Sequence, residues 1–174
     1  QVDVKHVPSS CIVSENGERY YQYTAIDEFS RFRYVEAFRE LSTYSSAVFL
    51  EHMLKAFPFK VECVQTDNGP EFTKHYGSRN SSALTMFEKR LEEHGIRHKK
   101  IRPFTPKHNG KVERSHRKDN EYFYASHRFY SFEDFAKQLK VHNRRYNAFP
   151  MRPLGWRSPK DTLYDFLLYG VTYV

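Results

Sequence analysis

The chain has 174 residues, a length that suits one domain with a substantial core. Its 28 lysines and arginines exceed its 21 aspartates and glutamates, and the net charge of +7 favours a polyanionic partner such as nucleic acid, with a merely soluble basic protein as the plain alternative. No apolar run is long enough to span a bilayer, no signal peptide is evident, and the two cysteines lack metal-type spacing, which excludes a membrane protein and a cysteine-based zinc site.

The N-terminal part of the chain has the alternation typical of strands. We predict strands over 1–7, 19–26 and 31–38, with a hairpin signal at Asn16-Gly17 before the second of them. The string Asp27-Glu28-Phe29-Ser30 predicts a tight turn between the second and third strands. Because the chain begins at Gln1 within a strand pattern, we expect it to be part of a longer protein.

Helices and two further strands alternate through the rest of the chain. Apolar spacing predicts helices over 42–57, 84–94, 111–126, 131–147 and 161–168, and strands over 60–66 and 97–101. Pro58 ends the first helix, and Ser131 with Asp134 opens the fourth. This order predicts an α/β protein with a mixed five-stranded sheet, three strands antiparallel and two parallel, flanked by helices on both sides.

Three carboxylates occupy positions from which they could share one pocket. Asp3 lies in the middle of the first strand, Asp67 at the end of the fourth, and Glu113 on the third helix. A single acid is usually a solvated surface charge, but a carboxylate cluster in a basic protein points to divalent cations that act on phosphate. Two such ions about 4 Å apart can activate an attacking oxygen and stabilise a leaving one, and three carboxylates are enough to hold them.

Four strings, in order along the chain, resemble the retroviral-integrase-type (DDE) catalytic core of bacterial insertion-sequence transposases. They lie at 25–31, 65–72, 109–114 and 146–159, and the resemblance covers almost the whole chain, to about residue 168. It implies a ribonuclease H-like fold, Mg²⁺ or Mn²⁺ as two ions, and a site made of Asp3, Asp67 and Glu113. It further implies hydrolysis at the end of a mobile element, followed by attack of the 3′-hydroxyl on target DNA.

The same resemblance implies partners and a domain plan. We expect a single core domain over 1–174, with strands and site in 1–126 and a helical extension in 127–174. We expect DNA ends and target DNA as partners, a homo-oligomer assembled on DNA, no membrane, and a bacterial, cytoplasmic, nucleoid-associated setting. Two alternatives stay open: a ribonuclease H-like nuclease that only hydrolyses, and a catalytically silent DNA-binding module.

Residues around Glu113 are the candidates for contacting DNA. Asn109, His116, Arg117 and Asn120 share its helix face by spacing and could touch phosphates. Relatives often carry a basic residue where Asn120 stands, so Arg117 is the substitute candidate. The basic run over 99–118 predicts a phosphate track, with a solvated face as the alternative. The predicted DNA-binding residues are Asn109, Lys111, Arg114, Arg117 and Lys118.

Several other residues receive structural interpretations. Asp27 lies in a familiar string but at a turn, so we interpret it as a turn former rather than as the first carboxylate. Glu71 is a candidate to support Asp67 without binding metal itself. Trp156 is expected to be a packing anchor. The spacing between Asp67 and Glu113 exceeds that of the family, and the surplus is assigned to a loop over 74–85.

Overall fold

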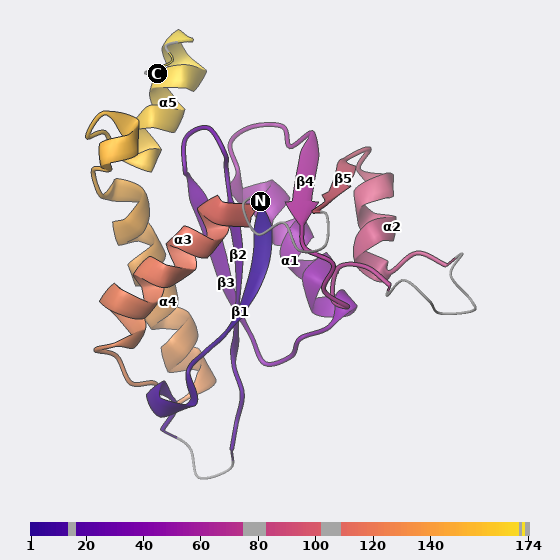
Figure 1. The fold of residues 1–174 in the computed structure, drawn as a ribbon, viewed down its shortest axis with the longest axis vertical. Coiled ribbons are helices and arrows are strands. Elements are labelled where there is room, and N and C mark those ends of the chain that lie inside the picture. The colour runs from indigo at the N-terminus through magenta and orange to yellow at the C-terminus, as the bar shows by residue number, and fades with distance from the viewer. Residues whose placement is uncertain (14–16, 75–82, 102–108, 171, 173–174) are drawn as a thin grey trace.

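The computed structural model of the chain describes residues 1–13, 17–74, 83–101, 109–170 and 172. Its strands are β1 (Val2–His6), β2 (Tyr21–Ile26), β3 (Arg33–Phe38), β4 (Cys63–Thr66) and β5 (Arg97–Lys100). Its α-helices are α1 (Thr43–Ala56), α2 (Met86–Glu93), α3 (Gly110–Asp119), α4 (Phe132–Ala148) and α5 (Pro159–Tyr169) (Figure 1). Each of the predicted strands and helices is present. Asn16 and most of the predicted 74–85 loop lie outside the described residues.

The strands are hydrogen-bonded in two groups that lie beside each other. β1, β2 and β3 form an antiparallel sheet in that order, in which Asp3 stands opposite Thr24. β4 and β5 are parallel, with Gln65 opposite Lys99. β1 contacts β4, so the two groups meet along the strand that carries Asp3 (Figure 1). Three antiparallel and two parallel strands with flanking helices confirm the predicted α/β class.

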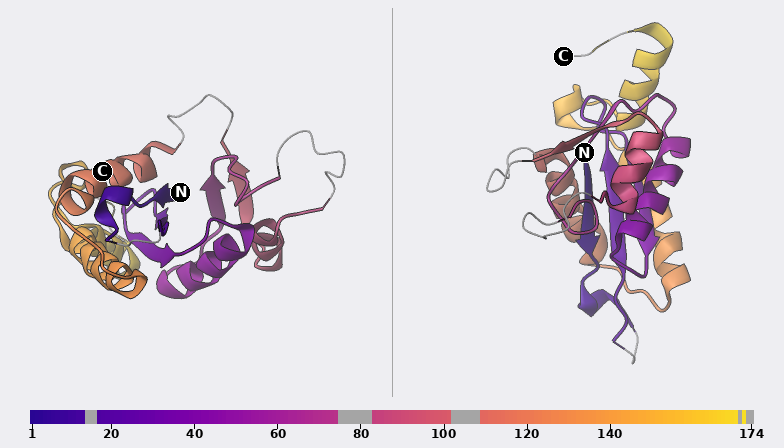
Figure 2. Two further views of the ribbon diagram at one scale, coloured as in Figure 1. Left: turned by 90° about the horizontal axis from the view of Figure 1, so that it is seen from below. Right: turned by 90° about the vertical axis from the view of Figure 1, so that its right-hand side faces the viewer.

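Helices cover both faces of the antiparallel sheet. Successive side chains of β2 point to opposite faces, so this strand packs against both layers of helices. Its Tyr23 and Ala25 belong to a core shared with α1, α2 and β4. A second core joins α4 and the π-helical turn Asn120–Tyr124, which follows α3, to the opposite face. Figure 2 shows α3 and α4 on one side of the sheet and α1 on the other. The second core contains Val7, Cys11, Tyr20, Val35, Phe123, Tyr124, Phe129, Phe135 and Leu139.

A buried polar layer separates α3 from the sheet. Gln22 and Thr24 point toward α3 from β2 and have no exposed surface. The Gln22 amide donates to Asp119 Oδ2 at 2.8 Å, and the hydroxyl of Tyr124 donates to Gln22. Thr24 Oγ1 is 2.9 Å from Nε2 of His116. These contacts fix the position of α3 over β1 and β2, because each buried polar group must keep its partner.

The turn after β2 is formed as predicted. Asp27 Oδ2 accepts hydrogen bonds from the backbone amide and the hydroxyl of Ser30, both at 2.7 Å. Arg31 then takes a positive φ of 63°, and its amide donates to the carbonyl of Asp27. Asp27 therefore caps a tight turn, and both described hydrogen bonds to its carboxylate are local ones.

The prediction for Trp156 is wrong. The residue is 70% exposed, so it is not a buried packing residue. Gly155 and Trp156 both have positive φ in a turn that is closed by the bridge between Met151 and Arg157. This turn directs the indole outward, and Leu154, at 5% exposure, is the residue that packs inside.

Candidate active site

Asp3 lies in the middle of β1, on the side of the strand that α3 crosses. Its Oδ1 accepts a hydrogen bond from the amide of Val4 at 2.9 Å. Its Oδ2 lies 3.4 Å from Nδ1 of His116, a buried residue of α3. The carboxylate keeps 21% of its surface exposed, so it is held by the protein on one side and open to solvent on the other.

Asp67 follows β4 directly, in a turn that the sequence Asp67-Asn68-Gly69 builds. Its Oδ1 accepts the amide of Gly69 at 2.9 Å, and the Asn68 amide group donates to the carbonyl of Ile101 at 3.0 Å. Burial raises the pKa of the Asp67 carboxyl, and the negative charge of Asp3 raises it further, against the opposing effect of the Gly69 amide. Two acids from different strand groups therefore lie close enough to repel.

Glu71 is a third acid near this pair. Its carboxylate lies against Gly69, where an added Cβ would come within 2.6 Å of both Glu71 oxygens, so no other side chain fits there without movement. Burial raises the pKa of Glu71 first, and the charges of Asp67 and Asp3 raise it too. This placement is compatible with the expected supporting role beside Asp67.

Glu113 lies on α3, one helical turn before His116, and its side chain is exposed. The spacing of three residues puts the two on neighbouring parts of the helix, and His116 reaches Asp3. The helix that carries Glu113 therefore contacts the strand that carries Asp3. Across the ranges that the structure describes, however, no three His, Cys, Asp or Glu side chains come close enough together to hold a metal ion.

The acids nevertheless fit a hard divalent cation in chemistry and in charge. Asp3 and Asp67 offer carboxylate oxygens, which Mg²⁺ and Mn²⁺ prefer over nitrogen or sulfur. Burial is the largest cause of the raised pKa values of Asp67 and Glu71, and the neighbouring negative charges add to it; a cation would relieve this second contribution. In the described arrangement Glu113 does not complete a metal site with Asp3 and Asp67. Its side chain is exposed and is therefore free to adopt other rotamers.

The five predicted DNA-binding residues divide into two groups. Arg114, Arg117 and Lys118 are exposed on α3 and available to a phosphate backbone. Asn109 is only 2% exposed, and the ammonium of Lys111 donates to the carbonyl of Glu28 at 2.9 Å, so both are engaged in or covered by the protein. Solvent-accessible charge on this face is therefore concentrated on the middle and end of α3.

The structure corrects two further expectations, one about His116 and one about the predicted phosphate track. His116, which shares the helix face of Glu113 in the sequence, is 9% exposed and contacts Asp3 and Thr24 instead of facing outward. Within the predicted phosphate track, Lys100 donates to Glu88 and Thr73 at 2.7 Å each, so it serves an internal contact. Arg102 and Lys107 lie outside the described residues.

The sequence did not reveal that His116 contacts both Asp3 and Thr24 beneath the candidate site. The pairing of Asp3 with Thr24 across β1 and β2 places that hydroxyl under α3, where His116 meets both residues. Two signals for this contact exist in the sequence. One is the three-residue spacing from Glu113 to His116, and the other is the antiparallel register of the first two strands.

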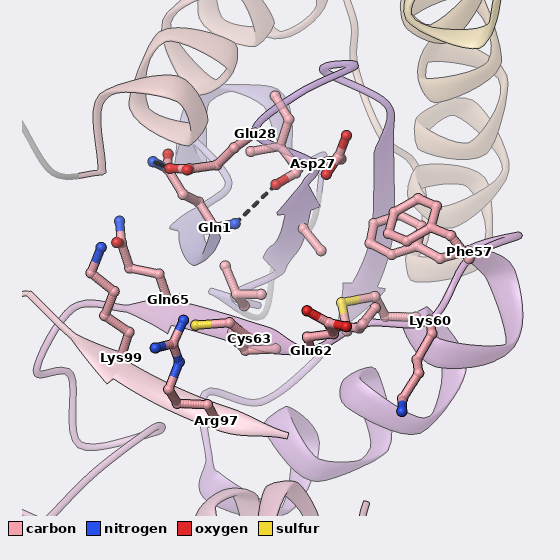
Figure 3. A pocket seen from close by; sticks show the side chains of 17 residues that line it. Gln1, Asp27, Glu28, Phe57, Lys60, Glu62, Cys63, Gln65, Arg97 and Lys99 are labelled. Atoms are coloured by element: carbon pink, nitrogen blue, oxygen red, sulfur yellow. Dashed lines mark hydrogen bonds between the residues drawn. The ribbon is translucent and has the colours of Figure 1, made fainter. Parts of the chain in front are cut away.

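A cavity of about 400 Å³ lies nearby but is distinct from this site (Figure 3). It opens between the start of β1 and the β4–β5 pair, where the Gln1 amine donates to the carbonyl of Ile26 at 2.9 Å. None of the predicted site residues lines it. Both acids and bases line it, so it lacks the single-sign charge that a polyanion needs. These charged residues are Asp27, Glu28, Glu62, Lys60, Arg97 and Lys99.

Comparison with known proteins connects this chain to one family. A family model of the integrase core domain matches residues 1–106, and a second integrase core domain model matches residues 94–159. The ORF3 protein of Spiroplasma virus SpV1-C74, which is named as an integrase, is 28% identical over 166 residues. A retrovirus-related Pol polyprotein from transposon RE2 of Arabidopsis thaliana is 30% identical over 111 residues, 63% of this chain. The chain spans 44% of the viral protein and 7% of the plant polyprotein.

Solved structures of the same shape confirm the ribonuclease H-like fold. The catalytic core of the integrase of BIV has a TM-score of 0.63 at 18% identity, covering 92% of this chain and 89% of its own. The HTLV-2 integrase catalytic core, solved in complex with magnesium, has a TM-score of 0.62 at 17% identity, with 92% and 91% covered. A simian T-cell lymphotropic virus intasome chain has a TM-score of 0.67 at 18% identity, with 92% and 51% covered.

Proposed function

Because the chain belongs to the integrase core domain family, we propose that it is the catalytic core of an enzyme that cuts and joins DNA for a mobile element. The observation that carries the proposal is the contact between β1, the strand of Asp3, and β4, which Asp67 directly follows. α3, the helix of Glu113, also contacts β1. The reaction is cleavage at a 3′ end followed by strand transfer.

Asp3, Asp67 and Glu113 are the proposed ligands of Mg²⁺ or Mn²⁺, with two ions as the working number. When bound, such ions supply Lewis acidity to the phosphate and lower the cost of forming an oxygen nucleophile. The residues of the chain supply the rest. His116 and the Val4 amide hold the Asp3 carboxylate, and the Gly69 amide holds Asp67. The magnesium-bound HTLV-2 core supports this choice of ion class.

Exposed cations on α3 are proposed to position the DNA. Arg114, Arg117 and Lys118 extend along the helix from Glu113, so a phosphate backbone lying on them would pass the carboxylate. We propose the ends of an element and its target DNA as the partners, and assembly of several copies on DNA, since both ends must join in one event. The intasome among the structural neighbours supports this assembly.

The cellular setting, the affiliation with bacterial insertion sequences and the single-domain plan are likewise proposals. We propose a bacterial cytoplasmic protein that acts at the nucleoid, with one core domain whose helical extension begins at residue 127. Among the helices of the described residues, none has both the length and the apolar character needed to cross a membrane.

The test is a cleavage and strand-transfer assay with the full-length protein, labelled element-end DNA and Mg²⁺ or Mn²⁺. Asp3→Asn, Asp67→Asn and Glu113→Gln are each expected to lower both activities by about a hundredfold or more. Two controls keep activity. Asp27→Asn retains an acceptor for Ser30, and Glu121→Gln removes an exposed acid from the π-helical turn that follows the helix of Glu113.

The possible outcomes of the assay separate the alternatives. Cleaved but unjoined DNA in the parent protein would identify a nuclease that only hydrolyses. DNA binding without either product would identify a catalytically silent module. Loss of activity in Asp27→Asn but not in Asp3→Asn would show that Asp27, and not Asp3, is the first carboxylate. That result would overturn the proposed site.

A further inference from the structure

Two hydrogen bonds in series connect His98 on β5 to the backbone of Asp67. Nε2 of His98 lies 2.8 Å from Oγ1 of Thr66, the last residue of β4. The Thr66 hydroxyl in turn donates to the carbonyl oxygen of Asp67 at 2.8 Å. Thr66 has no exposed surface, so its side chain can touch neither a DNA strand nor a hydrated ion. Any effect of Thr66 on the candidate site must therefore pass through Asp67.

The direction of these hydrogen bonds follows from the atoms that make them. A carbonyl oxygen only accepts, so the single hydroxyl hydrogen of Thr66 points to Asp67. Nε2 of His98 must then donate to Thr66 Oγ1, which leaves a lone pair on Nδ1. Nδ1 is buried and meets no hydrogen-bond partner among the described residues, an arrangement that disfavours an N–H group at this position. Burial, with a smaller contribution from the charge of Lys100, lowers the pKa of His98 to about 4, so the ring is neutral at pH 7.

Packing holds the donor ring of His98 in place. The ring meets the buried ring of Phe87 on α2 edge to face, with the centroids 5.6 Å apart. In the parallel pair of strands Val64 stands opposite His98, so Thr66 lies two residues further along the neighbouring strand. Both the strand pairing and the aromatic contact therefore direct Nε2 of His98 toward the Thr66 hydroxyl.

The Asp67 carboxylate depends on its backbone for its direction. Within the described residues it accepts one hydrogen bond, from the Gly69 amide to Oδ1, so Oδ2 remains available to a cation. Two further bonds tie the same stretch to the end of β5. The Ile101 amide donates to the Thr66 carbonyl, and the Asn68 side chain donates to the Ile101 carbonyl, each at 3.0 Å. The backbone is therefore held on both sides of Asp67.

We propose that Thr66 and His98 are positioning residues that orient the Asp67 carboxylate for a divalent cation by holding the Asp67 carbonyl. The inference rests on the proposed function, in which Asp67 is a ligand of Mg²⁺ or Mn²⁺. The Thr66 hydroxyl restrains the peptide between Asp67 and Asn68, and His98 keeps that hydroxyl pointed at the carbonyl. Partners that orient a metal ligand commonly change metal affinity or activity by about 10- to 100-fold.

The first measurement is Mn²⁺ binding to the full-length protein without DNA, followed by the electron paramagnetic resonance signal of the free ion. Thr66→Val removes the hydroxyl from a side chain of similar shape and is expected to weaken Mn²⁺ binding about 10- to 100-fold. Thr66→Ser keeps the hydroxyl and should bind the ion as the parent does. His98→Leu should weaken binding in the same direction as Thr66→Val, and His98→Gln, which retains an N–H donor, should recover most of the loss.

Thr162→Val is the matched control. Thr162 on α5 is also a buried threonine whose hydroxyl donates to a backbone carbonyl, that of Ser158 at 2.9 Å. Its substitution removes the same kind of bond far along the chain from Asp67, so Mn²⁺ affinity should stay at the value of the parent. The inference would be overturned if Thr66→Val bound Mn²⁺ like the parent, or if Thr162→Val lost as much affinity as Thr66→Val.

Strand transfer on labelled element-end DNA gives the second readout. Thr66→Val should lower the turnover rate while DNA affinity stays unchanged, because the Thr66 side chain is buried. A parallel loss of turnover and DNA affinity would mean that the substitution disturbs the fold, and the inference would fail while the proposed function stands. A parent protein that binds no Mn²⁺ and neither cuts nor joins DNA would overturn the proposed function, and the inference with it.

Discussion

The guanidinium of Arg33 on β3 donates from one nitrogen to both carboxylate oxygens of Asp119 on α3, each at 2.9 Å. Both side chains are completely buried. Burial alone would raise the pKa of Asp119, but Arg33 together with His142 and Gln22 holds it well below its usual range. The pair ties α3 to the sheet, and α3 carries Glu113 and His116. The geometry of the site therefore depends on an ion pair that contacts no substrate.

Asp119→Asn is expected to lower the free energy of unfolding by about 3–5 kcal/mol, because it leaves the Arg33 charge buried without its counter-charge. Urea unfolding followed by circular dichroism measures the change. Glu93→Gln is the control, since it removes one partner of the exposed pair between Arg90 and Glu93 and should cost about 0.5 kcal/mol or less. Equal effects of the two substitutions would show that the buried pair contributes no more than a surface pair.

His116 is expected to position Asp3 for the reaction. Its ring bridges Asp3 and Thr24, so His116→Ala should lower the turnover rate by about 10- to 100-fold while DNA affinity changes little. His116→Gln, which keeps a hydrogen-bond donor, should recover part of the rate. Turnover and DNA affinity are measured separately. If both fall in parallel, the residue stabilises the fold instead of orienting the carboxylate.

The elements could be predicted because their signals are local. Ser131, for example, does accept the amide of Asp134 at the start of α4, and the period of apolar residues located the helices. The partnership of Arg33 and Asp119 could not be predicted, because the two lie 86 residues apart and each resembles a surface charge in the sequence. The same limit explains Asn109 and Lys100, which look like solvated polar residues until the fold covers or pairs them.

The positions of Asp3 and Asp67 illustrate an intermediate case. Both neighbouring strands were predicted, the first of them from alternation, but it is the contact between β1 and β4 that brings the ends bearing the two acids together. The outward turn of Tyr122, which is 66% exposed, depends on a single extra residue in the π turn after α3, and apolar periodicity gives no sign of it. The local sequence pattern therefore assigned each acid to its secondary-structure element, and tertiary contacts between elements determined which residues each acid lies near.

Glu88 on α2 is expected to make the stability of the fold sensitive to acid. Burial raises its pKa, but hydrogen bonds from Lys100, the Thr85 amide and Thr73 outweigh burial and lower it to about 2, below its ordinary value of 4.5. A lowered folded-state pKa means that the contribution is complete above about pH 4.5 and is lost as the pH falls toward 2.

Glu88→Gln should therefore cost about 1–3 kcal/mol at pH 7 and markedly less at pH 3. Urea unfolding of both proteins at pH 7, 4.5 and 3 gives the comparison. Glu92→Gln, an exposed acid on the same helix, should show little difference at any of these pH values. A Glu88→Gln penalty that is as large at pH 3 as at pH 7 would rule out ionisation as the source of the stability.

Asp67→Asn should affect stability in opposite directions with and without metal. Without a divalent ion, the ionised Asp67 is disfavoured by burial and by Asp3, so the amide should raise the unfolding midpoint slightly while keeping the acceptor for Gly69. With Mg²⁺ or Mn²⁺ at ten times its dissociation constant, the parent should gain about 1.4 kcal/mol, and Asp67→Asn should gain much less.

Thermal unfolding at constant ionic strength, with and without the divalent ion, measures both effects, and Glu121→Gln should respond to the ion as the parent does. The two directions share one cause. A site that concentrates negative charge is costly when empty and binds a cation strongly for the same electrostatic reason. If the parent gains no stability from either ion while Asp67→Asn is still more stable than the parent, then Asp67 and Asp3 repel each other without forming a metal site.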